Sequence, residues 1–109
     1  QVTIFGDGQQ TRDFISVHDV ARANVVAATR TGLASGVVNI CTGRATSLLE
    51  VADVFRAHYP GAASPQHLTP RAGDIVHSLG DASRAEAEMA FRAEVPVREG
   101  LAELIRAGA

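Results

Sequence analysis

Lysine is absent from this sequence of 109 residues, and all ten of its strongly basic side chains are arginines. A chain without lysine cannot form a Schiff base through its own side chains, and it cannot place a P-loop lysine on a phosphate. Tryptophan is also absent, whereas 46% of the residues are hydrophobic and 20% are charged. This balance is typical of a soluble, packed globular domain.

The scarcity of cysteine, of long apolar runs and of net positive charge limits the expected compartment and partners. Cys41 is the single cysteine, which excludes an internal disulfide, and no apolar run approaches the roughly 20 residues that span a bilayer. The net charge of −2 provides no basic field for nucleic acid or anionic lipid. We therefore expect a cytoplasmic protein with no nucleic-acid and no membrane partner. Because the sequence opens on strand-like residues without an initiator Met or a signal peptide, we interpret its start as a cut end.

Three common kinds of site lack the spacing that they require. The histidines and the cysteine show no His-x-x-x-His or Cys-x-x-Cys pattern, so we expect no metal. Ser16, His18 and Asp19 are the residue types of a hydrolytic triad, but they are adjacent and no Gly-x-Ser-x-Gly motif is present. The turn at residues 6–8 follows a strand-like segment, yet Thr11 stands where a dinucleotide-binding turn has its third glycine. We interpret it as an ordinary turn.

The first half of the chain predicts two strands, a helix and a further strand. Residues 2–5 alternate in polarity and residues 11–17 are rich in β-formers, which predicts two short strands. Apolar residues at helical spacing predict a helix over residues 19–30, with Asp19 at its N-terminus. The short apolar run at residues 37–41 is typical of a buried parallel strand. Such a strand needs neighbours that this chain does not supply, so we expect an incomplete sheet.

The second half contains clear helix start signals. Ser47 and Glu50 form a Ser-x-x-Glu capping box, which predicts a helix over residues 48–58. A short strand is expected around residues 67–69, in the connection that follows. Two further helices are expected to begin at Asp81 and Pro96. The expected fold class is therefore α/β.

Two arginine and aspartate pairs lie in segments where chemistry is most plausible. Arg12 and Asp13 begin a β-prone segment, while Arg71 and Asp74 lie in a loop rich in Pro and Gly. The planar fork of arginine suits phosphate, and a neighbouring aspartate accepts hydrogen bonds from ribose hydroxyls. Two such loops facing each other would hold a nucleotide. The alternative is that each arginine pairs with a nearby aspartate at the surface.

Four segments resemble one known family in their order and spacing. They are residues 2–15, 17–21, 38–52 and 71–85. Together they resemble the C-terminal part of the extended short-chain dehydrogenase/reductase family, the group of UDP-glucose 4-epimerase and dTDP-glucose dehydratase. Because the four segments cover nearly the whole chain, the match is more specific than any single motif.

The resemblance implies roles for five residues of this chain. In the family, arginines at the positions of Arg12 and Arg71 contact the diphosphate of a nucleotide sugar, and an aspartate at Asp74 reaches the ribose. Main chain near Ile4 and Phe5 holds the pyrimidine. The family's reaction is a transient hydride transfer from the sugar to NAD. Its Tyr-x-x-x-Lys pair and its glycine-rich cofactor turn lie upstream of the matched part, so the resemblance implies no catalytic or NAD-binding residue here.

We therefore interpret residues 1–109 as a single C-terminal substrate-binding region of an NAD-dependent sugar epimerase or dehydratase, an extended Rossmann-type fold without its cofactor half. Its expected ligand is a UDP- or dTDP-sugar. Two alternatives remain open: a stand-alone nucleotide-sugar binding or regulatory module without catalysis, and a structural remnant without a ligand. The unpaired strand edge at residues 37–41 further predicts that the chain associates with itself.

Overall fold

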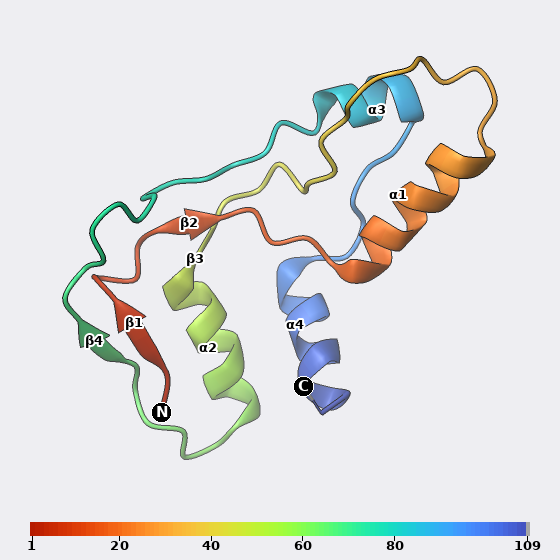
Figure 1. Cartoon of the computed structure of the whole chain (residues 1–109). Coiled ribbons are helices and arrows are strands. Elements are labelled where there is room, and N and C mark those ends of the chain that lie inside the picture. The colour runs from red at the N-terminus through yellow and green to blue at the C-terminus, as the bar shows by residue number, and fades with distance from the viewer. Residues whose placement is uncertain (109) are drawn as a thin grey trace.

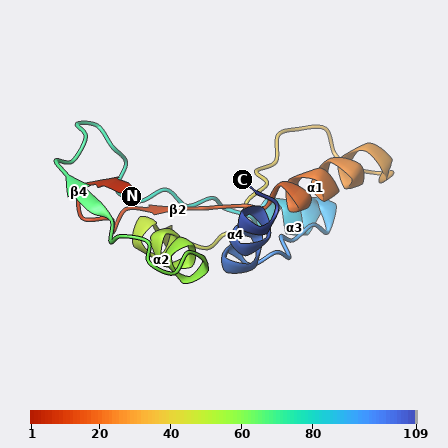
Figure 2. The ribbon, with the colours of Figure 1, turned by 90° about the horizontal axis from the view of Figure 1, so that it is seen from below.

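The computed structural model describes residues 1–108 as a flat arrangement of short elements with extents of 51 × 33 × 16 Å. The elements are β1 (Thr3–Phe5), β2 (Thr11–Arg12), α1 (Val17–Thr29), β3 (Thr46–Ser47), α2 (Leu48–His58), β4 (Gln66–Leu68), α3 (Ser83–Met89) and α4 (Val97–Arg106). Figure 1 shows β1, β4 and α2 at one end and α1 with α3 at the other, joined by long connecting segments. Figure 2 shows how thin this arrangement is when seen from below.

Two small sheets hold the strands. β1 pairs in parallel with β4, with Thr3 opposite Gln66, and β2 pairs antiparallel with β3, with Thr11 opposite Ser47. Only two strands contribute to each sheet among the described residues, so the α/β fold with an incomplete sheet is confirmed. The predicted strand near residues 67–69 is confirmed as β4, one residue earlier.

The turn between β1 and β2 depends on glycine. Gly6 and Gly8 have φ values of 86° and 79°, in the left-handed region that favours glycine. A Cβ atom at Gly8 would lie 2.8 Å from the Leu49 side chain, so the turn also packs closely against α2. This turn therefore sets the position of β2 relative to α2.

The helices follow their start signals closely, with one correction. The capping box of α2 is confirmed, since Ser47 accepts from the Glu50 N–H and the Glu50 carboxylate accepts from the Ser47 N–H. α1 begins at Val17, two residues earlier than predicted, because the Ser16 side chain caps it by accepting from the His18 N–H. Asp19, expected to cap the helix or to favour its N-terminus, is not the cap but lies in the first turn, so the second expectation is confirmed. Its carboxylate is turned instead toward a distant segment of the chain.

Two predicted strands are wrong. The strand expected over residues 11–17 is only Thr11–Arg12, because the chain turns into α1 after it. The structure contains no strand at residues 37–41. A strand requires hydrogen bonds to a neighbour, and no backbone group of residues 37–41 pairs with another backbone group of the described chain. Because the neighbouring strands are missing, as the sequence led us to expect, residues 37–41 do not form a strand.

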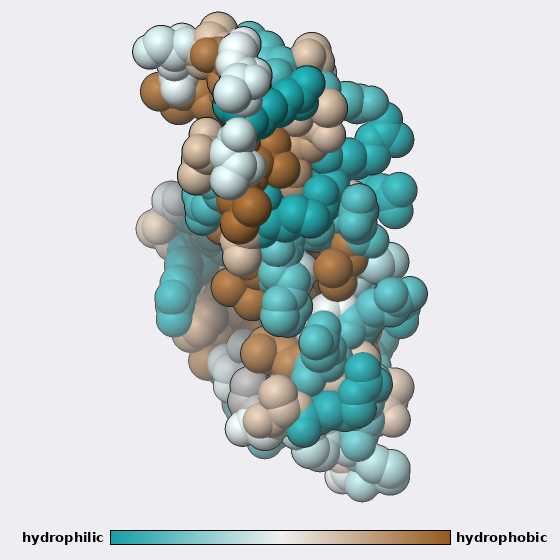
Figure 3. Space-filling view, turned by 90° about the vertical axis from the view of Figure 1, so that its right-hand side faces the viewer, coloured by the Kyte–Doolittle hydropathy of each residue, from teal (hydrophilic) through white to brown (hydrophobic). Residues whose placement is uncertain are grey.

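The buried core is small and divided. Phe91, Met89, Ala23 and Ala85 form a cluster between α1 and α3, with half-buried side chains such as Val38 packed around it. Three of the seven buried hydrophobic residues are alanines, so the apolar area removed from water is limited. Figure 3 shows hydrophobic side chains scattered among hydrophilic ones on the face that it presents. A small core of this kind predicts marginal stability for the chain alone.

Self-association through residues 37–41 is our first testable prediction. Val37 is 82% exposed, and the unpaired backbone beside it offers a template for pairing with a second copy. We expect sedimentation velocity to show a growing oligomer fraction as the protein concentration rises. Asn39→Pro, which removes a backbone N–H donor from the segment, should reduce that fraction, whereas Ser35→Pro outside it should not. A monomer at every concentration, with a concentration-independent melting curve, would refute this prediction.

Candidate functional site

A cavity of about 380 Å³ beside β1 brings together all five residues for which the sequence predicted a ligand role. Ile4 and Phe5 come from β1, Arg12 comes from β2, and Arg71 and Asp74 come from the loop that follows β4. The two arginines are far apart in sequence and meet because β1 and β4 are paired. The remaining lining residues are Thr3, Gln10, Leu48, Ala72 and Gly73.

Arg12 is held in place by three acceptors. Its Nη2 donates to Asp74 Oδ1 at 2.8 Å, and its Nη1 donates to the carbonyl oxygens of Ile75 at 2.6 Å and Thr11 at 2.8 Å. The arginine therefore pairs with Asp74 across the cavity and not with its sequence neighbour Asp13. At 30% and 37% exposure of the two side chains, this pair contributes at most about 1 kcal/mol to stability, but it fixes the direction of the guanidinium.

Arg71 is held differently, because it stacks on an aromatic ring. Its guanidinium carbon lies 3.8 Å from the centroid of the Phe5 ring, a cation–π contact. Among the described residues it has no carboxylate partner within ion-pair distance. Stacking engages the face of the guanidinium and leaves its N–H edge available to an anion. Arg71 is therefore the freer of the two cations in this cavity.

Gln10 is a member of this cavity that the sequence interpretation missed. It is buried, with 8% of its surface exposed, and its Nε2 donates to the Phe5 carbonyl at 2.8 Å and to Asp74 Oδ2 at 3.5 Å. A signal was present, because residues two apart on an extended segment face the same side, and Gln10 precedes Arg12 by two. Gln10 thus links the strand backbone to the carboxylate that also holds Arg12.

The second edge of β1 faces away from β4. The Val2 carbonyl and the Gly6 N–H both pair with β4, so the main chain of Ile4, midway between them, also faces β4. The main-chain groups of Thr3 and Phe5 alternate to the opposite edge, where Gln10 already binds the Phe5 carbonyl. The strand therefore offers backbone donors and acceptors from Thr3 and Phe5, and not from Ile4, to the cavity.

Asp13 joins three separate segments just outside the cavity. Its Oδ1 accepts from the N–H and the hydroxyl of Thr42, at 2.9 and 2.6 Å, and its Oδ2 accepts from the N–H groups of Gly43 and Gly80, at 2.9 and 3.4 Å. Burial alone raises the pKa of the Asp13 carboxyl, but these hydrogen bonds outweigh burial and hold the pKa below its ordinary value. The carboxylate is therefore ionised and structural at neutral pH.

Asp19 makes a similar connection elsewhere in the molecule. It is 2% exposed and accepts from the N–H groups of Glu94 and Val95 and from Arg22. Burial again raises the pKa of this carboxyl, and the hydrogen bonds from Val95, Glu94 and Arg22 outweigh it, so that the pKa lies below its ordinary value. Asp19 therefore ties α1 to the segment that leads into α4.

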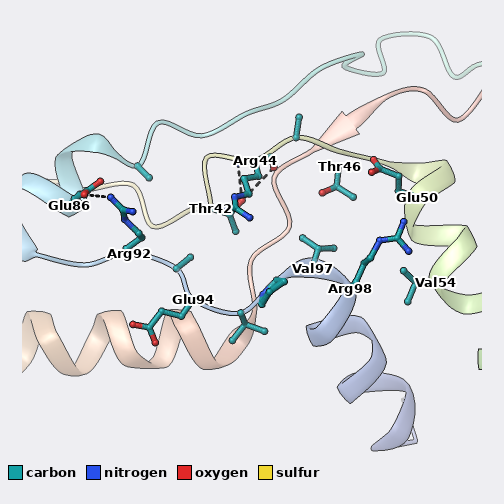
Figure 4. A pocket seen from close by; sticks show the side chains of 15 residues that line it. Thr42, Arg44, Thr46, Glu50, Val54, Glu86, Arg92, Glu94, Val97 and Arg98 are labelled. Atoms are coloured by element: carbon teal, nitrogen blue, oxygen red, sulfur yellow. Dashed lines mark hydrogen bonds and ion pairs between the residues drawn. The ribbon is translucent and has the colours of Figure 1, made fainter.

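A larger cavity, of about 590 Å³, lies between α2, α4 and residues 42–46. Figure 4 shows the Arg92 guanidinium turned toward Glu86 and the Arg98 side chain beside Glu50. Two of its three basic side chains thus lie close to acidic ones, and none of the five predicted residues lines it. Cavity size alone therefore does not identify the site. In residues 1–108 no group of three or more His, Cys, Asp or Glu side chains is placed to hold a metal ion.

Known proteins are similar to this chain in sequence and in fold. The model of the NAD dependent epimerase/dehydratase family matches residues 1–41. A dTDP-L-rhamnose 4-epimerase of Burkholderia thailandensis is 36% identical over 104 residues, which cover 94% of this chain and 28% of that protein. A UDP-glucose 4-epimerase of Thermotoga maritima, solved with UDP-glucose, superposes with a TM-score of 0.85 at 32% identity, over 99% of this chain and 35% of the other.

This chain belongs to the NAD-dependent epimerase/dehydratase family. MoeE5, solved with UDP-glucuronic acid and NAD, superposes on it with a TM-score of 0.86 at 35% identity, over 99% of this chain and 37% of the other. The incomplete α/β fold is therefore a portion of the extended Rossmann-type fold of this family. The chain spans about a third of the length of the family members that it matches. None of the helices within residues 1–108 is both long and apolar enough to cross a membrane.

Proposed function

We propose that this chain holds the nucleotide part of a UDP- or dTDP-sugar in an NAD-dependent sugar epimerase or dehydratase, as the C-terminal part of that enzyme. Arg12 and Arg71 form a clamp for the diphosphate, and Asp74 accepts from the ribose hydroxyls. The observation that carries this proposal is the meeting of both arginines, Asp74 and the free edge of β1 in one cavity.

The chemistry of each group fits its proposed role. Charge-assisted hydrogen bonds to phosphate contribute about 1.5–3 kcal/mol each, and a chain with net charge −2 needs particular cations to hold an anion. Arg71 offers its free N–H edge to the diphosphate, while Arg12 donates to the Asp74 carboxylate beside it. The backbone donor and acceptor groups of Thr3 and Phe5 at the free edge of β1 suit the alternating acceptors and donor of a uracil or thymine ring.

Hydride transfer belongs to the rest of such an enzyme. NAD held by that other part would supply the hydride acceptor of the reaction. The residues present here do not fit the cofactor, because the chain has no lysine for a Tyr-x-x-x-Lys pair and its glycine turn packs against Leu49. This chain contributes binding and orientation of the nucleotide, so that the sugar is directed away from the cavity toward the part that performs the chemistry.

The clamp is tested by titrating UDP calorimetrically into the wild type and four variants. We expect Arg71→Ala and Arg12→Ala to weaken UDP binding by about ten-fold to a hundred-fold, because each removes a charge-assisted hydrogen bond. Arg71→Lys should recover only part of the loss, since a point charge does not reproduce the bidentate fork. Arg56→Ala is the matched control, because Arg56 lies on α2 in an exposed pair with Asp53. Clamp variants that bind UDP like this control would exclude the proposed role.

A stand-alone nucleotide-sugar binding module is the second candidate. It would bind its ligand in the same cavity but would work without a cofactor-binding part. The two candidates differ in what the natural polypeptide contains. A longer natural polypeptide, shown by its intact mass, whose sequence contains an upstream glycine-rich turn and a Tyr-x-x-x-Lys motif supports the enzyme. A natural chain of this length that binds UDP supports the module. In both cases the chain by itself is expected to give no saturable signal with NAD and no turnover of a nucleotide sugar.

A further inference from the structure

The segment that carries Asp74 is not held in place by packing. Ile75, Val76 and Leu79 are 60%, 62% and 57% exposed, so burial of their side chains does not fix residues 74–80. Hydrogen bonds fix this segment instead. The Thr11 carbonyl accepts from the Ser78 N–H at 3.1 Å, and the Thr11 N–H donates to the Val76 carbonyl at 2.8 Å. The position of Asp74 therefore depends on how firmly residues 75–80 are fastened to β2.

Asp13 fastens the far end of this segment. Its Oδ2 accepts from the Gly80 N–H, while its Oδ1 accepts from both polar groups of Thr42. Gly80 also approaches Cys41 so closely that a Cβ atom at Gly80 would lie 2.5 Å from the Cys41 Sγ. Residues 41–43, residue 80 and β2 are thus joined at one carboxylate, directly next to Arg12 in the sequence.

We propose that Asp13 is a positioning residue for the diphosphate clamp, which acts by fixing the distance and direction between Arg12 and Asp74 without touching the ligand. Arg12 uses the Ile75 carbonyl and the Asp74 carboxylate as its supports. Both supports lie on the segment that Asp13 anchors at Gly80. Releasing that anchor leaves residues 74–80 held mainly by the Thr11 backbone pairs with Val76 and Ser78, so the segment is freer to shift and the guanidinium of Arg12 is less firmly directed. This inference rests on the nucleotide-binding function proposed above.

A purely structural role for Asp13 makes a different prediction. Loss of folded protein lowers the affinity for every ligand of the cavity by the same factor. Loss of clamp geometry lowers the affinity for a diphosphate and spares a ligand that has none. UDP and uridine differ by the diphosphate alone, so the ratio of their affinities separates the two accounts.

The experiment titrates UDP and uridine into the wild type, Asp13→Asn and Asp19→Asn by calorimetry and ligand-observed NMR. Asp19 is the matched control, because it also accepts N–H groups from a remote segment but none from residues 74–80. We expect Asp13→Asn to lower UDP affinity about ten-fold and to change uridine affinity by less than about two-fold. Asp19→Asn should change neither affinity per folded molecule.

A second pair of variants covers the case in which Asp13→Asn does not fold. Thr42→Val removes the hydroxyl donor at 2.6 Å from Asp13, whereas Thr42→Ser keeps it. We expect Thr42→Val to weaken UDP binding about three-fold and Thr42→Ser to retain wild-type affinity. Equal losses for UDP and uridine, or equal UDP affinity in both Thr42 variants, would overturn the positioning role. If Arg71→Ala also binds UDP as tightly as the wild type, the proposed function itself fails.

Discussion

Asp19→Ala is expected to lower the free energy of unfolding by about 3 kcal/mol. The substitution leaves the N–H groups of Glu94 and Val95 without an acceptor, at about 1–3 kcal/mol each, and it removes the partner of Arg22. Because Asp19 is 2% exposed, water does not easily replace the lost acceptor. Urea unfolding monitored by circular dichroism measures the change. The matched control is Asp53→Ala, which removes an exposed carboxylate from α2 and should cost less than about 0.5 kcal/mol.

The same carboxylate should make the wild type sensitive to acid. The folded-state pKa of Asp19 lies below its unfolded value, so the stabilisation is complete above the unfolded pKa of about 3.9 and is lost as the pH falls through the folded value. Asp19→Ala should therefore flatten the dependence of stability on pH in this acidic range. If Asp19→Ala leaves the pH dependence unchanged, or lowers the free energy of unfolding no more than Asp53→Ala does, then Asp19 does not connect α1 to residues 94–95.

Phe91→Ala should lower the free energy of unfolding by at least as much, about 3–5 kcal/mol. Phe91 is 2% exposed and is the largest apolar side chain of the cluster between α1 and α3, where Arg22 also stacks on its ring. Ala90, at φ 49°, turns the chain after α3 so that Phe91 packs back onto this cluster. Truncation leaves a cavity that the surrounding alanines cannot fill.

The control for this prediction is Val25→Ala on α1. Val25 is 61% exposed, so its truncation should change the unfolding free energy by less than about 0.5 kcal/mol. Phe91→Leu, which keeps most of the volume, should cost less than Phe91→Ala. Urea titrations of the three variants under the same conditions test the ranking. If Phe91→Ala costs no more than Val25→Ala, α1 and α3 do not share a core in solution.

Local signals in the sequence were sufficient for α2, and a family resemblance was sufficient for the grouping of the clamp residues. The Ser47 and Glu50 capping box is a contact between residues three apart, so the sequence predicts it directly. The five ligand residues were predicted from a family resemblance, and the structure places them around one cavity. Their role in binding a ligand stays a prediction.

Long-range contacts could not be predicted in the same way. The partners of Asp19 lie 75 and 76 residues further along the chain, and those of Asp13 lie 29 to 67 residues away. Nothing in the sequence near either aspartate distinguishes a carboxylate that joins segments from one that caps a helix or pairs with an arginine. The strand at residues 37–41 failed for a related reason, because strand formation depends on neighbours that local sequence does not describe.

Because β1 pairs with the distant strand β4, the cavity beside β1 is expected to fold late. Thr3 lies opposite Gln66, so the strand that begins the chain must wait for a partner that is more than sixty residues away. Closing so long a loop carries an entropic cost before any contact repays it, and contacts of high sequence separation form slowly. During synthesis β1 therefore emerges before β4 and stays without its partner until β4 has emerged. The cavity beside β1 is expected to be among the last parts of this chain to form, after α1 and α2 have folded locally.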